Sequence, residues 1–336
     1  MKSQLVNRWK TESGVLLAQQ IRKTLMAGEP LEKIDGIEKN GYRLDLRGIT
    51  LSELEDEQTI KAGEHQAIFK AGILKLKNNV FDAIDFSFST ISYAQIQKCK
   101  FSNCVFESVI AKELEISASD FIDCVFKKVN FYCSFMNKNI GSNSGSYVNC
   151  TFDEANLTET SFRFPTIKNC VFKNCKLSAT NFDGSRFDNC KFIGKVDSPL
   201  FKGYSVYAVK SILWIFNRID PKMYPNKMLN VDFSEAEMKG VSFSHGIDLT
   251  TCIFPKGDQY IFIKNLNGTM TNVRETIATE WEDDEQERGL RLIDNLFYDK
   301  RKQDQQMDFI DTLFTGNYDP EFDKIFFDLI KNNLRD

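Results

Sequence analysis

The sequence is poor in the residues on which most enzyme active sites depend. It has two histidines, His65 and His245, which stand far apart and have no cysteine or carboxylate arranged with them as a catalytic triad. No phosphate-binding glycine loop, nucleophile elbow or paired-histidine zinc motif occurs. We therefore interpret both histidines as solvated polar residues, place no active site in the chain, and expect neither a cofactor nor a metal.

Long apolar runs and strongly basic stretches are also absent. The first stretch, Met1 to Lys23, mixes polar and charged residues, and no later run is long and apolar enough to span a bilayer. Residues 81–255 carry 19 basic and 18 acidic side chains, whereas residues 256–336 carry 11 basic and 18 acidic ones. No stretch is basic enough to bind the phosphate backbone of a nucleic acid. We expect a cytoplasmic protein with no membrane partner and no nucleic-acid partner.

What the sequence has in excess is phenylalanine, with 29 residues against seven prolines. A bulky apolar side chain returns at every fifth position. The first row is Phe81, Phe86, Ile91, Ile96, Phe101 and Phe106, and after Ala111 it resumes with Ile116, Phe121, Phe126, Phe131 and Met136. The second row, displaced by one residue, is Phe152, Leu157, Phe162, Ile167, Phe172, Leu177, Phe182, Phe187 and Phe192. The third is Phe233, Met238 and Phe243 and, after another slip of one residue, Leu249 and Phe254.

A second inward position precedes each of these residues by two and is small or of moderate size, as at Ala94, Cys104, Ala155 and Ser185. Strands repeat every second residue and helices every 3.6, so neither produces this pattern. A strict period of five with paired large and small residues predicts a coil with flat faces, with one pentapeptide on each face.

The pattern resembles that of the pentapeptide-repeat family, whose consensus is alanine, then aspartate or asparagine, then leucine and two variable residues. Ala155-Asn156-Leu157 and Thr180-Asn181-Phe182 follow it. The resemblance implies a mainly β fold, a right-handed quadrilateral parallel β-helix with four pentapeptides to a coil. We expect this solenoid at 76–255, an N-terminal helical capping segment at 1–75 and a C-terminal acidic helical module at 256–336.

Nine cysteines raise the question of a metal site or of disulfides. Eight of them fall two residues before a central apolar residue, and Cys133 is the exception. Cys104 and Cys124 lie one 20-residue coil apart, as do Cys150, Cys170 and Cys190, so we expect columns of buried sulfur atoms. Cysteine is a common small core residue, whereas structural zinc requires clustered pairs. We interpret these cysteines as core filler.

Two stretches interrupt the repeat, at 137–149 and at 193–230. The first is rich in asparagine, glycine and serine and predicts a loop. In the second, Tyr204 to Ile219 predicts a helix that is apolar except for a narrow polar stripe. This helix either packs on the solenoid or contacts a partner. The candidate partner-contact residues are Tyr204, Tyr207, Trp214, Phe216 and Arg218.

Helices are expected at both ends of the chain. The N-terminal helix has Thr11 or Ser13 as its cap and ends at Gly28, and we expect it to cover the first coil. In the C-terminal module, helices are predicted at about 272–301 and 304–314. A last helix follows Asp319, with Pro320 at its first position.

Three functions remain open on the sequence. The preferred one is a non-catalytic scaffold that binds another protein of unknown identity. The resemblance to the family implies that such a scaffold could be a bacterial immunity protein or a toxin-neutralising factor. A homodimer is also compatible with this function. The second is a DNA mimic that modulates a type II topoisomerase (gyrase protection), for which the balanced charge of 81–255 is poorly suited. The third is a cryptic enzyme in the C-terminal helical module.

Overall fold

The computed structural model describes residues 2–52, 57–62, 65–70, 73–140, 143–205, 225–297, 304–313 and 319–335. The chain divides into two compact units, Met1–Thr180 and Asn181–Asp336. Short parallel strands dominate the first unit, and the second combines such strands with three helices in its described parts. In the described parts of the chain, no helix has the length and apolar character needed to cross a bilayer.

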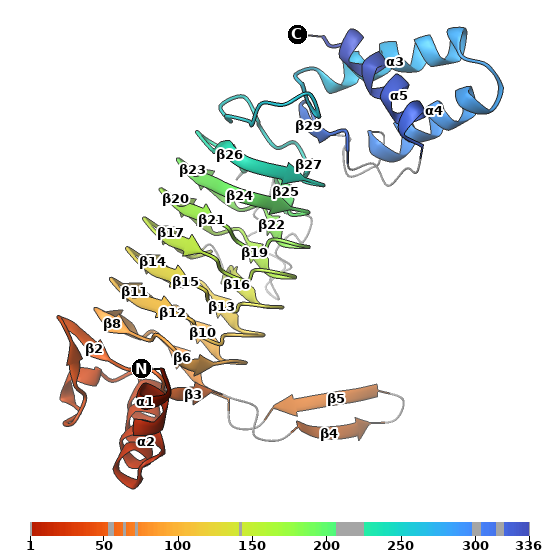
Figure 1. The fold of residues 1–336 in the computed structure, drawn as a ribbon. Helices are drawn as coiled ribbons and strands as arrows, with labels where there is room; N and C mark the ends of the chain where they lie inside the picture. Colours follow the sequence, from red (N-terminus) through yellow and green to blue (C-terminus); the bar gives the residue numbers. More distant parts are fainter. Residues whose placement is uncertain are drawn as a thin grey trace, which may run out of the picture. The chain divides into compact units, whose positions relative to one another are not determined.

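Parallel strands form the sides of a four-sided coil in the first unit, and they follow one another as a stack (Figure 1). One side contains β6 (Lys75–Lys77), β10 (Gln95–Gln97), β13 (Glu115–Ser117), β16 (Phe135–Lys138) and β19 (Ser161–Arg163). The next contains β7 (Val80–Asp82), β11 (Lys100–Ser102), β14 (Asp120–Ile122), β17 (Ser146–Val148) and β20 (Thr166–Lys168).

The third side contains β2 (Arg43–Asp45), β8 (Ile84–Asp85), β12 (Val105–Glu107), β15 (Val125–Lys127), β18 (Thr151–Asp153) and β21 (Val171–Lys173). The fourth side begins with β3 (Thr50–Ser52) and β9 (Thr90–Ile91) and continues as single parallel bridges such as Ile110 to Asn130. Each coil therefore uses four pentapeptides, and the predicted β-helix is confirmed.

The core consists of the predicted rows of large side chains, stacked from coil to coil. Phe81, Phe101 and Phe121 stack with ring centroids 4.5 and 4.7 Å apart. Phe126 and Phe152 stack at 4.8 Å. These separations match the spacing of hydrogen-bonded strands, about 4.8 Å, because each ring sits on the strand next to the one before. The position of each phenylalanine is thus fixed by the backbone ladder.

The corners of the coil use left-handed backbone conformations at residues other than glycine. Asp123, Asn149 and Asn169 have φ between 52° and 54°, a region that aspartate and asparagine tolerate better than other side chains. Their side chains also bond from coil to coil: Asn149 Nδ2 donates to Asp123 Oδ1 at 2.9 Å, and Asn169 Nδ2 to Asn149 Oδ1 at 3.0 Å. This corner is therefore stabilised by a side-chain ladder as well as by the sheets.

The interruption predicted at 137–149 is shorter than that range. Strand β16 ends at Lys138 and β17 already begins at Ser146. Phe126 pairs with Phe152, 26 residues later, where other coils advance by 20. Six extra residues equal one pentapeptide plus one residue, which explains why the second row of apolar residues is displaced by one. Tyr147 belongs to that row and stacks on Phe121 at 5.1 Å.

The coil begins earlier than the predicted boundary at residue 76. Strand β2 pairs with β8, and β3 pairs with β9, so the 43–52 stretch of the predicted capping segment already forms two sides of a coil. Strand β1 (Lys39–Asn40) pairs with β2, and an antiparallel hairpin of β4 (Glu57–Ala62) and β5 (His65–Lys70) interrupts this first coil. The five-residue spacing of apolar residues is lost across the hairpin, so the sequence does not show that the coil begins before residue 76.

The N-terminal helices are α1 (Lys2–Asn7) and α2 (Glu12–Ala27), with the 3-10 turns η1 (Arg8–Lys10) and η2 (Leu31–Lys33). Of the two candidate caps, Thr11 is the one used: its side chain accepts a hydrogen bond from Gly14 N, and Gly28 ends the helix with φ 74°. Asn79 Nδ2 donates to Leu25 O at 2.8 Å, so α2 lies on the first coil as expected.

Coils also build the first part of the second unit. Its strands are β22 (Asn181–Asp183), β23 (Arg186–Asp188), β24 (Lys191–Asp197), β25 (Leu200–Lys202), β26 (Asp232–Lys239) and β27 (Ser242–Ser244). Strand β24 pairs with β26, and β25 with β22 and β27. The first ten residues of the predicted interruption at 193–230 are therefore mostly strand, and the coil continues to Lys202. Phe182 and Phe201 are 19 residues apart, which broke the five-residue count.

The C-terminal module contains α3 (Leu266–Glu280), α4 (Asp283–Leu296) and α5 (Pro320–Asn332) around a shared apolar core. The helix predicted at 272–301 is two helices, because Trp281 has extended backbone and its ring packs against Phe322. The helix predicted at 304–314 is wrong: β29 (Asp308–Asp311) pairs antiparallel with β28 (Tyr260–Ile263). The cap at Asp319, which accepts from Phe322 N, is confirmed.

Candidate protein-binding site

The structure places His245 in the interior of the second unit. His245 was expected in solvent, but it is 5% exposed, with Nδ1 2.8 Å from Ser244 Oγ and its ring at the edge of Tyr204. The prediction failed because a five-residue count cannot tell which corners a neighbouring segment covers. The described residues contain no group of three or more histidine, cysteine or acidic side chains that could hold a metal ion.

The cysteines line the core as the repeat predicts. Seven of the nine are buried, Cys252 is half-buried and Cys133 is exposed. The pairing of Val105, Val125, Thr151 and Val171 across coils places the preceding residues, Cys104, Cys124, Cys150 and Cys170, in one column. Burial raises the pKa of Cys175 to about 12 and also raises that of Cys99. Thiols in such apolar surroundings stay protonated and unreactive.

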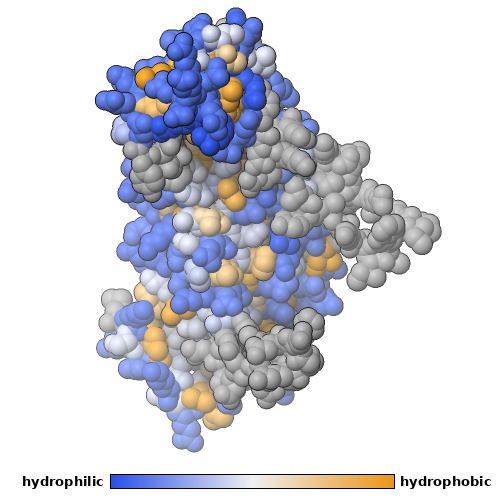
Figure 2. All heavy atoms as spheres, turned by 90° about the vertical axis from the view of Figure 1, so that its right-hand side faces the viewer, coloured by the Kyte–Doolittle hydropathy of each residue, from blue (hydrophilic) through white to orange (hydrophobic). Residues whose placement is uncertain are grey.

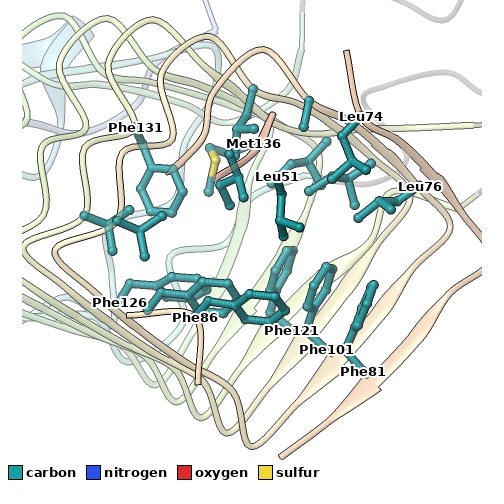
Figure 3. Close-up of a pocket in the computed structure, with 18 of the residues that line it drawn as sticks. Leu51, Leu74, Leu76, Phe81, Phe86, Phe101, Phe121, Phe126, Phe131 and Met136 are labelled. Atoms are coloured by element: carbon teal, nitrogen blue, oxygen red, sulfur yellow. The ribbon is translucent and has the colours of Figure 1, made fainter. Parts of the chain in front are cut away.

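A small cavity lies inside the first unit, among the stacked side chains. Figure 3 shows Phe81, Phe101 and Phe121 along one side of it, with Leu51 and Met136 opposite. Its volume is about 30 Å³ and its lining is entirely apolar. That volume is the share of a single water molecule in the liquid, and a water there would find no polar partner. The cavity is a packing defect of the core and offers no ligand site.

Of the five predicted partner-contact residues, the structure describes Tyr204. Its hydroxyl donates to Asp304 Oδ2 at 2.5 Å, and its ring centroid lies 5.3 Å from that of His245. Tyr204 thus ties β25 to the segment that leads into β29, within the second unit. Tyr207, Trp214, Phe216 and Arg218 lie outside the described residues, so their contact with a partner stays a prediction.

An open groove of about 600 Å³ lies in the first unit between α2 and the segment 35–38. An ion-pair network on the first coil lies at the base of the groove and joins Arg8, just before α2, to Asp45 of β2. Arg8 donates to both carboxylate oxygens of Asp45, at 2.7 and 3.1 Å, and Arg47 does the same at 2.8 and 3.0 Å. Trp9 Nε1 donates to Arg47 O at 2.8 Å.

The network fixes the charge state of the groove floor. Burial opposes ionisation of Asp45, but the hydrogen bonds from Arg47 and Arg8 outweigh it and hold the pKa of this carboxyl at about 2. Gly48 allows the close approach: with φ 76°, a Cβ there would lie 2.7 Å from the Leu5 backbone. The N-terminal helices are therefore pinned to the coil, which gives the groove a defined wall.

The walls of the groove combine apolar and acidic side chains. Leu16 is 62% exposed, and Leu17 and Ile37 are half-buried beside it. Asp35 is exposed, and the Glu38 side chain is 79% exposed and 3.6 Å from Arg8. The residues that line the groove include three acidic side chains, Asp35, Glu38 and Asp45, against one basic side chain, Arg8, so the groove is acidic overall. Such a surface suits a ligand with an apolar group next to a positive charge.

The sequence-based candidates did not include this groove. Its two walls are about 20 residues apart in sequence, and no motif marks them. One signal was present: Leu16 lies off the buried face of α2, which contains Ile21 and Leu25. A single exposed leucine is common on protein surfaces, so this signal alone had no weight.

A model of a known protein family matches part of the coil. The family model described as pentapeptide repeats matches eight copies at residues 155–194. The strand registers extend the same five-residue spacing over coils outside that range. Residues 155–194 are therefore pentapeptide repeats of the type that this family model describes. No curated protein sequence matches it.

Solved pentapeptide-repeat structures include several with low similarity to this chain. HetL, involved in heterocyst differentiation regulation in the cyanobacterium Nostoc sp., is 10% identical to this chain with a TM-score of 0.31. The match covers 65% of this chain and 94% of HetL. Full-length QnrB1, a plasmid-mediated fluoroquinolone resistance protein, is 12% identical with a TM-score of 0.22, covering 60% and 92%. Rfr23 from the cyanobacterium Cyanothece is 15% identical with a TM-score of 0.14, covering 44% and 86%.

The outer surface of the pentapeptide-repeat coils carries mixed charge. On the third side of the first unit, the strand register places Glu107 beside Lys127, Lys127 beside Asp153, and Asp153 beside Lys173 on adjacent coils. The sign alternates at every step, so this side has no continuous negative face. In the view of Figure 2, hydrophilic residues cover most of the surface shown and the apolar ones form small separate groups.

Proposed function

We propose that this pentapeptide-repeat protein is a non-catalytic scaffold that binds another protein through the groove between α2 and residues 35–38. The observation that carries the proposal is the exposed apolar wall at Leu16 beside the acidic rim at Glu38. The volume of about 600 Å³ lies within the range typical of binding pockets. The coil supplies a firm support, because its strands are hydrogen-bonded to those of the neighbouring coils.

The partner that fits this groove is a protein segment with a basic residue next to an apolar one. Its apolar side chain would lie against Leu16, Leu17 and Ile37, and its basic group would reach Asp35 or Glu38. A bacterial immunity or toxin-neutralising role is the specific form of this function that we put forward. In that role the bound segment belongs to a toxin, and the scaffold occupies a surface that the toxin needs.

The experiment is quantitative affinity purification from the native host, with the wild-type chain and two double variants as baits. Leu16→Ala with Glu38→Lys changes the groove. Met26→Ala with Glu29→Lys makes a comparable truncation and the same charge reversal at exposed sites at the end of the helix, outside the groove. We expect one protein to be recovered with the wild type and the control but lost with the groove variant. Equal recovery with all three baits would remove the groove from the proposal.

The recovered protein then tests the specific role. If it is a toxin, co-expression of the wild-type chain should restore growth of cells that express it, and the groove variant should not. Recovery of a type II topoisomerase instead, with protection of its supercoiling activity from a quinolone, would favour the DNA-mimic alternative. The alternating charges of the third side argue against that outcome, because a mimic of DNA needs an extended negative face.

The described part of the C-terminal module gives no support to a cryptic enzyme. Two of its ion pairs, Arg274 with Asp294 and Arg288 with Asp319, join helices to one another or to a helix cap. Arg288 also lies over the ring of Phe322 at 3.9 Å. These contacts stabilise the packing of α3, α4 and α5, which is a structural role.

A further inference from the structure

The third side of the first unit carries a row of charges that alternate in sign. We call Glu107, Lys127, Asp153 and Lys173 the charge ladder. Each follows a buried phenylalanine of β12, β15, β18 or β21 and therefore lies on the outer face. The strand register places each one directly beside the next. These four strands are consecutive in their sheet, and β12, β15 and β21 can be followed in the stack of Figure 1.

Neighbouring charges of the ladder lie side by side on adjacent coils without forming ion pairs with one another. Among the described residues, none of its four side chains forms an ion pair. Lys128 and Glu154, one position further along the strands, do so at 3.7 Å. On the other side of each buried phenylalanine runs a β-branched row, Val105, Val125, Thr151 and Val171, in which Val125 is 39% exposed. The face therefore combines alternating charges that form no ion pair with a parallel row of β-branched side chains.

An alternating ladder with an even number of members is complementary to itself when it is reversed. Read in one direction the signs are minus, plus, minus, plus, and in the other they are plus, minus, plus, minus. We infer that this face binds the same face of a second copy of the chain, with the two stacks antiparallel. The two-fold axis runs along the strands, between the coils of Lys127 and Asp153. This interface is separate from the groove and does not depend on the proposed function.

In that arrangement every charge of the ladder meets its opposite. Glu107 faces Lys173 of the second copy, and Lys127 faces Asp153 of the second copy. The same axis sets Lys128 against Glu154 and Val125 against Thr151 of the second copy. An axis along the stack would instead place the charges over the β-branched row, where they would lose water without gaining a partner. Charge complementarity thus selects one of the two orientations.

The interface is small. The ladder spans three strand spacings, about 14 Å, so its area falls below the roughly 1,200 Å² of standard interfaces. We expect a reversible dimer that forms at high protein concentration and weakens with added salt, because exposed ion pairs are screened. Packed sheets lie about 10 Å apart, a distance that lysine and carboxylate side chains of facing strands can bridge.

The outer pair of the ladder provides the test, because Glu107 and Lys173 are three coils apart within one chain and meet only across the dimer. Sedimentation equilibrium of the full chain over a range of concentrations measures the dimer directly. We expect Glu107→Lys and Lys173→Glu each to weaken it by roughly 10-fold or more, since the two-fold axis repeats every substitution. Lys112→Glu, an equal change of charge on the fourth side, should have no effect.

Mixing the two single variants is the decisive measurement. A chain with Glu107→Lys presents lysine at both outer positions, and a chain with Lys173→Glu presents glutamate at both, so the mixture should form a heterodimer at wild-type affinity. Restoration also shows that both variants are folded. A wild-type chain that stays monomeric at all concentrations, or a mixture that stays monomeric while the wild type dimerises, would overturn the inference.

Discussion

The ion pairs of Asp45 give the most specific prediction about stability. Asp45→Asn keeps the shape of the side chain but removes the charge that Arg8 and Arg47 share. The pKa of Asp45 falls from 3.8 to about 2 in the folded chain. One pKa unit corresponds to about 1.4 kcal/mol, so the ionised carboxylate stabilises the fold by about 2 kcal/mol. We expect the variant to lose about that much free energy of unfolding at neutral pH.

The effect has a defined pH dependence. A group whose pKa is depressed on folding contributes its full stability above the unfolded value, here 3.8, and loses it as the pH falls through the folded value, about 2. The difference between wild type and Asp45→Asn should therefore be constant above about pH 5, shrink between pH 4 and 2, and approach zero below that range.

Urea unfolding followed by circular dichroism at several pH values measures this difference. Asp82→Asn is the matched control, because Asp82 is exposed and accepts a hydrogen bond from Asn103 that an asparagine could also accept. The control should change the free energy of unfolding by less than about 0.5 kcal/mol. If Asp45→Asn unfolds like the wild type at pH 7, or if its deficit is the same at pH 2, the ion pairs do not hold the N-terminal helices.

Three further predictions concern the coil. Phe152→Ala removes a fully buried ring stacked on Phe126 and Phe172, so we expect a loss of about 3–5 kcal/mol in the free energy of unfolding. Gly145→Ala should lower the melting temperature, because Gly145 has φ 71° and a Cβ there would collide with Ser119 O; an unchanged melting temperature would contradict the insertion geometry. In a thiol titration of the native chain, Cys133 should react first and the buried cysteines only on unfolding; rapid reaction of several thiols would show that the core is open.

The sequence was sufficient for the architecture because the repeat is local. Phe172 and Phe182 are buried for the same reason, their place within a pentapeptide, and no distant contact is needed to predict it. The cysteine column follows from the same rule. The helix caps at Thr11 and Asp319 were also readable, since each depends on a bond to a backbone N–H three residues later.

Features that join distant segments could not be read in this way. The groove exists because Arg8 meets Asp45, 37 residues later, and no periodicity links the two. Strand β29 was predicted as helix because its partner β28 lies 45 residues earlier, and its pairing outweighs the local preference. The orientation of His245 depends on the position of Tyr204. Sequence alone determined the repeating coil, whose contacts recur at a fixed short spacing. The tertiary structure decided the groove and the buried corner, because these form where unrelated segments meet.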